Sequence, residues 1–388
     1  MFQTKYTRFC LIIPSAILLC FVLTIGGLYL WYYLDQFKIP LQPAAEGGFP
    51  TKPVWVFEAE DRIVSTPVIE DSSIFLRSTN HLISIDPLSG KLLWSTGSDV
   101  PYNIHTGDLT IAPLVNGDLI VVPEKGSSLK AYSITTGKER WKTPEIGANL
   151  KNPGTASIES YAIGGERLFV ARFSWTLSAY DLVNGDLLWE KSLPDKALLN
   201  VAADSKGVYV GEDNILRIYD PVSGEVLWEK DFGSSIGKLL LDDKTLYVVL
   251  PDGPNSLIAL DLDNLQVKWS DERDKFRGDE LRTLALAGDN LYVGGNRLFN
   301  ISKVNGAVLW ESEKTGLLER PATIKDKVIV RNTNKDLFLF DTITGQRLGQ
   351  LKIRANTPMQ HDPDRSPAVV NDLLIVPFGD NRIYAYRP

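Results

Sequence analysis

Residues 216–228, LRIYDPVSGEVLW, carry the pattern that decides the fold. Apolar side chains such as Ile218 and Val226 alternate with polar ones on either side of a short turn, as in the two strands of a hairpin. Gly224 supplies the positive φ that a tight turn favours. Trp228 follows four residues later, on the returning strand. Taken alone, this stretch predicts an ordinary β-hairpin.

The same hairpin recurs along the chain at a nearly constant interval. Successive tryptophans from Trp94 to Trp310 are separated by 47, 48, 39, 41 and 41 residues, a period typical of propellers and repeat arrays. With one more in a lone N-terminal strand, the repeat tryptophans are Trp55, Trp94, Trp141, Trp189, Trp228, Trp269 and Trp310. The turn glycines are Gly90, Gly137, Gly185, Gly224, Gly306 and Gly345. Leu265 replaces the glycine in one turn, and Gly349 replaces the tryptophan in one strand.

A shorter hairpin precedes each copy: an apolar strand, a polar turn and a second apolar strand, as in LLLDDKTLYV at residues 239–248. Two hairpins per period make a four-stranded antiparallel sheet, the blade of a propeller. The chain has eight of the shorter hairpins but only seven complete longer ones. A strand at residues 53–59 would supply the missing outer strand and remove two open sheet edges. We therefore predict an all-β, eight-bladed β-propeller over residues 52–388, closed by pairing of its N- and C-terminal strands.

The N-terminal region has the features of a membrane anchor. Residues 9–34 contain no charge, and a run of this length can span about 30 Å of hydrocarbon. Lys5 and Arg8 precede it, so the positive-inside rule places residues 1–8 in the cytoplasm and the propeller outside it. The run is longer than the apolar core of a cleaved signal peptide, which favours a single-pass signal anchor. Residues 35–51, rich in Pro and Gly, are expected to be a linker.

Composition and motifs argue against several functions. The formal net charge is −7, whereas nucleic-acid binding relies on basic patches. The three histidines, His81, His105 and His361, have no partner at metal-ligand spacing, and no G-x-S-x-G, H-E-x-x-H or P-loop motif occurs. The residues alone therefore predict no catalytic site and no metal site.

The motif at residues 86–94, 181–189 and 220–228 (DPLSGKLLW, DLVNGDLLW and DPVSGEVLW) resembles the tryptophan-docking repeat of the quinoprotein-type, PQQ-like-repeat propellers. The resemblance covers nearly all of residues 52–388. It implies that each tryptophan packs between neighbouring blades and that the glycine turn receives it.

This family contains enzymes that hold pyrroloquinoline quinone under a vicinal disulfide, with calcium nearby. The propeller region has no cysteine and no D-x-D-x-D-G calcium loop. The resemblance therefore implies the non-enzymatic branch, which includes the BamB-type propeller of the outer-membrane assembly machinery. We expect no enzymatic activity and no cofactor.

Departures from the repeat indicate a candidate binding face. Long connections at residues 97–109, 144–156 and 352–364 fall on the face opposite the glycine turns, and long loops on one face of a scaffold commonly form a binding surface. Trp175 lies outside the tryptophan period, and basic residues precede several innermost strands, where they would ring the channel mouth. The candidate residues are Tyr102, His105, Lys151, Trp175, Lys238, Arg282, Arg320 and Arg365. Neutral drift of surface loops, and simple balancing of nearby acids, are the alternatives.

These observations predict a membrane-anchored, extracytoplasmic propeller that acts as a protein-interaction scaffold in the cell envelope. Its expected partners are a protein and the membrane, but no nucleic acid. The alternative functions are a sensor that binds a small molecule or glycan at the channel mouth, and a quinone-dependent dehydrogenase.

Overall fold

The computed structural model describes residues 44–98, 112–145, 158–193, 199–251, 256–271, 276, 279–352, 366–378 and 381–388. The predicted membrane segment at residues 9–34 lies outside this set. None of the described residues form a helix that is both long and apolar enough to cross a bilayer.

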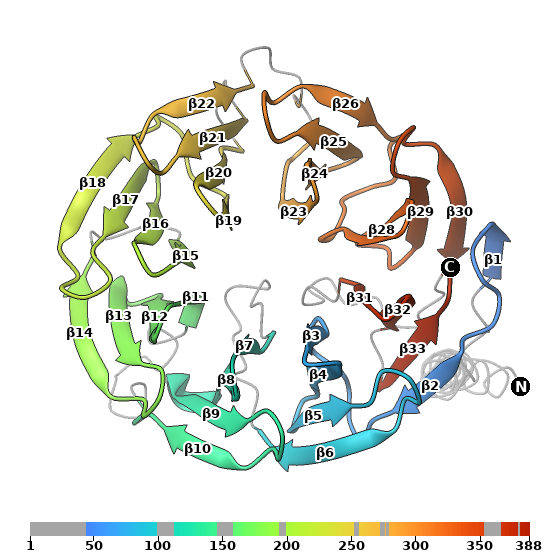
Figure 1. Ribbon diagram of the computed structural model, residues 1–388, viewed down its shortest axis with the longest axis horizontal. Coiled ribbons are helices and arrows are strands. Elements are labelled where there is room, and N and C mark those ends of the chain that lie inside the picture. The colour runs from blue at the N-terminus through green and yellow to red at the C-terminus, as the bar shows by residue number, and fades with distance from the viewer. Residues whose placement is uncertain are drawn as a thin grey trace, which may run out of the picture. The chain divides into compact units, whose positions relative to one another are not determined.

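The described strands form eight sheets arranged as the blades of a ring (Figure 1). From the innermost strand outward, the first four blades are β3 (Val68–Glu70), β4 (Ser73–Arg77), β5 (His81–Ile85) and β6 (Leu92–Gly97); β7 (Leu114–Asn116), β8 (Leu119–Pro123), β9 (Leu129–Ser133) and β10 (Glu139–Lys142); β11 (Ile158–Gly164), β12 (Arg167–Arg172), β13 (Thr176–Asp181) and β14 (Leu187–Ser192); and β15 (Leu199–Ala203), β16 (Val208–Glu212), β17 (Ile215–Tyr219) and β18 (Val226–Asp231).

The remaining blades follow the same order. They are β19 (Lys238–Asp242), β20 (Thr245–Val249), β21 (Leu257–Asp261) and β22 (Val267–Ser270); β23 (Thr283–Ala287), β24 (Asn290–Gly294), β25 (Leu298–Ser302) and β26 (Val308–Glu311); β27 (Ala322–Ile324), β28 (Lys327–Arg331), β29 (Leu337–Asp341) and β30 (Arg347–Lys352), with β1 (Ala44–Gly47) added outside; and β31 (Ala368–Val370), β32 (Leu373–Pro377), β33 (Arg382–Tyr386) and β2 (Trp55–Glu58). The prediction of an eight-bladed, all-β propeller with antiparallel blades is confirmed.

Burial explains why the middle strands read as continuous apolar runs. Every residue of β16 and β20 is buried, because both faces of these strands are covered by neighbouring blades. One core cluster, for example, joins Phe169 of the third blade to Val210 of the fourth. The outermost strands instead expose most of their residues, as in β14.

The two ends of the propeller meet in the eighth blade. Strand β2 pairs antiparallel with β33, and Trp55 lies opposite Ala385. The chain thus closes its ring with an N-terminal outer strand, as the strand count predicts.

The end of the predicted linker at residues 35–51 belongs to the propeller. Strand β1 pairs with β30 from Ala44↔Lys352 to Gly47↔Gly349 and makes the seventh blade five-stranded. The predicted boundary at residue 52 therefore moves to residue 44. The sequence AAEG has no apolar alternation that would have indicated a strand.

Six repeat tryptophans lie against the turn of the following blade. A β-carbon built on the turn glycine of that blade would lie 2.5–2.9 Å from an indole atom. Each of the six Nε1–H groups donates to a carbonyl of the same turn at 2.8–3.2 Å, and Trp141 to Leu182 is one example. The ring of one blade is thereby fixed by packing and by one hydrogen bond to the next.

The seventh blade departs from this scheme because the eighth has no glycine turn; its outer strand comes from the other end of the chain. Gly349 stands at the tryptophan position, and β1 passes so close that a β-carbon on Gly47 would lie 2.6 Å from the Leu348 carbonyl. Phe49, only 3% exposed, fills the junction instead. It packs in the core cluster of the two blades and lies edge-on to the Tyr386 ring, with 5.8 Å between the ring centroids.

Candidate interaction surface

In each blade, the connection from the previous blade and the loop between the second and third strands lie at one end of the strands. We call this side the loop face. The other side, with the glycine turns and the turns between first and second strands, is the turn face. Of the predicted binding residues, Tyr102, His105, Lys151 and Arg365 lie outside the described residues, whereas Trp175, Lys238, Arg282 and Arg320 are described.

Three basic residues occupy equivalent places on the loop face of consecutive blades. Lys238 begins β19, Arg282 immediately precedes β23, and Arg320 lies two residues before β27. All three are exposed, and their strands are the innermost of the fifth, sixth and seventh blades (Figure 1). The structure therefore places these three side chains along one arc beside the channel mouth. We call them the basic arc.

The basic arc is only partly neutralised. Arg282 Nη2 pairs with Glu280 Oε2 at 3.0 Å. Arg320 donates its backbone N–H to Ser366 Oγ at 3.0 Å, which leaves its guanidinium free of that contact. Within the described part of the chain, the side chains of Lys238 and Arg320 form no ion pair. Two cations are thus available to an anionic group approaching the loop face.

Other polar residues near the channel mouth join neighbouring blades. Ser160 Oγ accepts from the Val201 N–H at 3.1 Å. Asn200 Nδ2 donates to the Ile236 carbonyl at 3.4 Å, and Thr283 Oγ1 donates to a carbonyl of the seventh blade at 3.3 Å. These groups serve the ring itself, so polarity at this position alone does not identify a binding residue.

Trp175 lies in the loop between the second and third strands of the third blade. Its φ is +55°, its ring is half-buried against the core cluster of the third and fourth blades, and the Phe173 ring lies 6.0 Å away. Its backbone N–H and C=O bond Arg172 and Leu193. Packing against the core therefore explains why a tryptophan occupies this position, although Trp175 also lies on the loop face with the basic arc.

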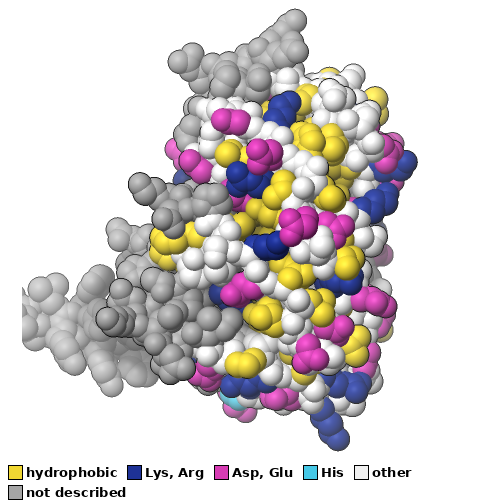
Figure 2. Space-filling view, turned by 90° about the vertical axis from the view of Figure 1, so that its left-hand side faces the viewer, with side chains coloured by type: hydrophobic (Ala, Val, Ile, Leu, Met, Phe, Trp, Pro, Cys, Tyr) yellow, Lys and Arg dark blue, Asp and Glu magenta, His cyan; other side chains and the backbone are white. Residues whose placement is uncertain are grey.

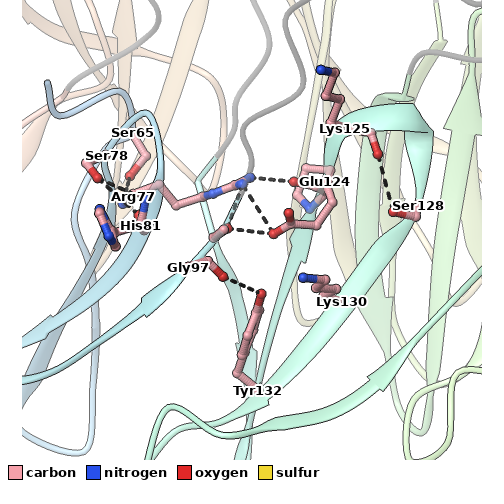
Figure 3. Close-up of polar contacts among 12 residues, drawn as sticks. Ser65, Arg77, Ser78, His81, Gly97, Glu124, Lys125, Ser128, Lys130 and Tyr132 are labelled. Atoms are coloured by element: carbon pink, nitrogen blue, oxygen red, sulfur yellow. Dashed lines mark hydrogen bonds and ion pairs between the residues drawn. The ribbon is translucent and has the colours of Figure 1, made fainter. Parts of the chain in front are cut away.

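A buried polar cluster joins the first and second blades beneath the loop face. Figure 3 shows the fully buried Arg77 side chain extending from the first blade toward Glu124 of the second. Its Nη1 donates to the Pro123 carbonyl at 2.5 Å, and its Nη2 donates to Ser98 Oγ at 2.8 Å. Ser98 in turn donates to Glu124 at 2.6 Å, and Arg77 Nη2 lies 3.5 Å from the same carboxylate. Removing one partner from such a pair would leave a costly buried charge.

Two further buried arginines occupy the same position in their blades. Arg172 donates to Ser178 Oγ at 2.8 Å and to Tyr180 Oη at 2.7 Å. The Nη1 atom of Arg331 lies 3.7 Å from Oε2 of Glu319. None of these arginines was among the predicted site residues, yet the sequence carried a signal: each is a charged residue that directly follows the apolar run of the second strand of its blade.

A comparable acid lies at the end of the second strand of the fourth blade. Glu212 is bonded by Arg217 and by the Tyr219 hydroxyl. Burial raises the pKa of the Glu212 carboxyl above its usual range, although both partners oppose this shift. Burial likewise raises the pKa of the Tyr219 phenol. These three residues bond one another, and the Glu212 side chain is buried, so we interpret the group as structural.

The one histidine in the described residues does not form a nucleophilic site. His81 Nδ1 lies 2.9 Å from Asp61 Oδ2, but the nearby Ser78 hydroxyl donates to Asp61 at 2.7 Å and to the His81 carbonyl, not to the imidazole. A serine nucleophile would need the imidazole as its base. Within the described residues, no group of three or more His, Cys, Asp or Glu could hold a metal ion. The expectation that the chain is not an enzyme stays a prediction.

The outer rim carries charges of both signs. Figure 2 views the rim on the side of β14 and β18, where Lys and Arg alternate with Asp and Glu around scattered apolar side chains. Leu187, Leu188, Val226 and Leu227 are exposed on these two strands. This surface offers no continuous basic face for a phosphate backbone.

Comparison with known proteins places this geometry in a family. The family model for the outer membrane protein assembly factor BamB matches residues 49–214, 175–311 and 275–388. The chain belongs to the BamB family. A BamB from Shewanella oneidensis is 24% identical over 299 residues, covering 76% of this chain. The match spans only 63% of that relative's length.

Solved structures agree on the fold. The crystal structure of BamB from Moraxella catarrhalis has a TM-score of 0.60 at 17% identity, covering 87% of this chain and 97% of the other. The computationally designed Ika8 protein has a TM-score of 0.63 at 14% identity, covering 85% and 98%. A designed protein matches as well as a natural BamB, so these likenesses establish the propeller and leave the function to the surface residues.

Proposed function

We propose that this chain is a scaffold of the cell envelope that takes part in the assembly of outer membrane proteins by binding another protein through its loop face. Membership of the BamB family carries the proposal, since the matched relative is named as an assembly factor. The basic arc supports the choice of face, because Lys238, Arg282 and Arg320 lie exposed at one end of adjacent inner strands. An acidic loop of the partner is the complementary surface.

We also propose that the chain is anchored in the membrane. The uncharged run at residues 9–34 would anchor the chain with residues 1–8 in the cytoplasm and the propeller outside the cytoplasm, as a single-pass protein. The tether would be shorter than residues 35–51, because β1 begins at Ala44.

The test is a charge reversal of the basic arc in the full-length chain. We expect the triple substitution Lys238→Glu, Arg282→Glu and Arg320→Glu to lower the yield of folded outer membrane β-barrel proteins, as deletion of the gene should also do. Gel mobility of heated and unheated membrane samples measures that yield. Like charges that face each other across the rim of an interface slow association, and a change of rim charge alters its salt dependence.

A matched control carries the same change of charge on the turn face. The exposed residues Lys91, Lys138 and Lys325 lie in turns of three blades there, and their substitution by Glu should preserve assembly. Full complementation by the loop-face variant would refute the proposed face. Normal folding of outer membrane proteins after gene deletion would refute the proposed role.

A further inference from the structure

One of the seven repeat tryptophans does not dock like the others. All seven are among the described residues, and six donate Nε1–H to a carbonyl in the turn of the next blade. By the repeat, the carbonyl for Trp228 is that of Leu262. Trp228 makes no such hydrogen bond with any described residue, and its ring is half-buried.

The cause lies in the turn of the fifth blade. Leu265 takes the glycine position there, and it keeps the turn geometry of its counterparts: its φ is +59°, and its N–H bonds the Asp261 carbonyl at 2.9 Å. At the six glycines, a β-carbon would lie within 2.9 Å of the docked indole. The β-carbon of Leu265 therefore excludes the Trp228 ring from the docked position.

A cavity of about 150 Å³ opens where the ring would have docked. It lies on the turn face between the fourth and fifth blades. Its apolar wall consists of Tyr209, Ile218, Leu227, Trp228, Leu262 and Leu265, and its charged rim consists of Asp204, Lys206, Asp243, Lys244 and Asp263. Sites for small molecules are usually at least about 300 Å³. This cavity is the size of a single side chain.

The rim favours a cation. Lys244 Nζ pairs with Asp263 Oδ2 at 2.7 Å, so these two charges compensate each other. The remaining charges of the rim are those of Asp204, Asp243 and Lys206, which leave one net negative charge. The carboxylate of Asp243 has no partner among the described residues, whereas Asp204 accepts from Lys206 N–H at 2.7 Å and from the Tyr209 hydroxyl at 3.3 Å.

Arginine matches this combination of surfaces. A guanidinium stacks well on an indole face, its methylene stem packs against apolar walls, and its five donors suit paired carboxylates. The unused Trp228 Nε1–H can donate to a backbone carbonyl beside the bound side chain.

We propose that the Trp228 pocket binds one arginine side chain of an extended segment of a partner protein. The pocket lies on the turn face, away from the basic arc, so the inference does not depend on the proposed function of the loop face.

The first experiment follows the indole N–H signals of the full-length, ¹⁵N-tryptophan-labelled chain by NMR. The Trp228 signal, assigned with Trp228→Phe, should exchange with water faster than those of the six docked tryptophans. Addition of N-acetyl-arginine amide should shift this signal with saturation, and the acetylated amides of glutamate and leucine should not. Saturable shifts with glutamate or leucine, or none with arginine, would overturn the proposal.

The matched variants differ by one methyl group. Leu265→Gly removes the β-carbon, so Trp228 should dock, its N–H should become protected, and arginine binding should be lost while the fold is kept. Leu265→Ala retains the β-carbon and should retain binding. Asp243→Asn should weaken binding about two- to fivefold, the size of a partly exposed ion pair. Equal binding by the glycine and alanine variants would also contradict the proposal.

Discussion

At each turn glycine, the missing side chain leaves room for the indole of the preceding blade. Gly185 shows this with φ +78° and a would-be β-carbon 2.6 Å from the Trp141 ring. Gly117 also has a positive φ, +56°, but nothing lies within 4 Å of its β-carbon position. The pair separates the cost of the backbone conformation from the cost of displacing the ring.

We expect Gly185→Ala to lower the free energy of unfolding by more than Gly117→Ala. Both substitutions place a β-carbon in the left-handed region, at a cost of about 1–2 kcal/mol. Gly185→Ala should add about 1–3 kcal/mol from overpacking against Trp141. Guanidinium unfolding of the two variants and the wild type measures the difference, and equal losses would show that the turn, not the ring, limits the substitution.

The recurring turn is stabilised by its own residues, because the aspartate at its start accepts hydrogen bonds from the backbone of the turn. Asp86 accepts from Ser89 N–H at 2.7 Å, and Asp220 accepts from Ser223 N–H at 2.6 Å. The Ser89 hydroxyl holds the pKa of Asp86 below its usual value, as the Ser223 backbone does for Asp220. The Thr344 backbone has the same effect on the pKa of Asp341.

These lowered pKa values make stability depend on pH. The unfolded chain binds a proton at each aspartate near pH 3.9, above the folded value, so the contribution is complete above that pH and is lost as the pH falls through the folded pKa. We expect the combined Asp86→Asn, Asp220→Asn and Asp341→Asn variant to lose less stability than the wild type between about pH 5 and pH 3. Denaturant unfolding at several pH values measures this, and parallel pH curves would count against it.

In the whole molecule, we expect the weak point of the ring to be the junction between the seventh and eighth blades, next to the strands that close it. Six junctions use a docked tryptophan and a turn of the next blade, and the junction between the fourth and fifth blades has the undocked Trp228. The junction between the seventh and eighth blades instead depends on Phe49, supplied by the N-terminal segment. Strand β1 positions Phe49 by pairing with β30. Closure therefore depends on residues 44–51 as well as on strand β2.

We expect Phe49→Ala to destabilise the protein by about 3–5 kcal/mol, the usual cost of emptying a buried aromatic site. Hydrogen exchange should show where the loss falls: amides of β30 and β33 should exchange faster, while those of β16, across the ring, should change little. Uniform acceleration around the ring would mean that the propeller unfolds as one unit and that this junction is not its weak point.

The fold could be predicted from the sequence because the same blade pattern occurs several times along the chain. Hairpin alternation, turn glycines and a tryptophan period are local patterns, and the strand count alone required Trp55 to complete the eighth blade. Part of the binding surface also followed from the repeat, since Lys238, Arg282 and Arg320 stand just before inner strands. Tyr102, His105, Lys151 and Arg365 remain predictions outside the described residues.

By itself, the sequence determined the blade number, the closure and the two positions where the motif fails, Leu265 and Gly349. Only the tertiary structure decided what those failures mean. A β-carbon at Leu265 keeps Trp228 out of its turn and opens a pocket, whereas at Gly349 the strand β1 and Phe49 occupy the place of a tryptophan that has no turn to receive it. Both outcomes depend on which atoms meet between neighbouring blades. The spacing of the repeat along the sequence does not specify those contacts.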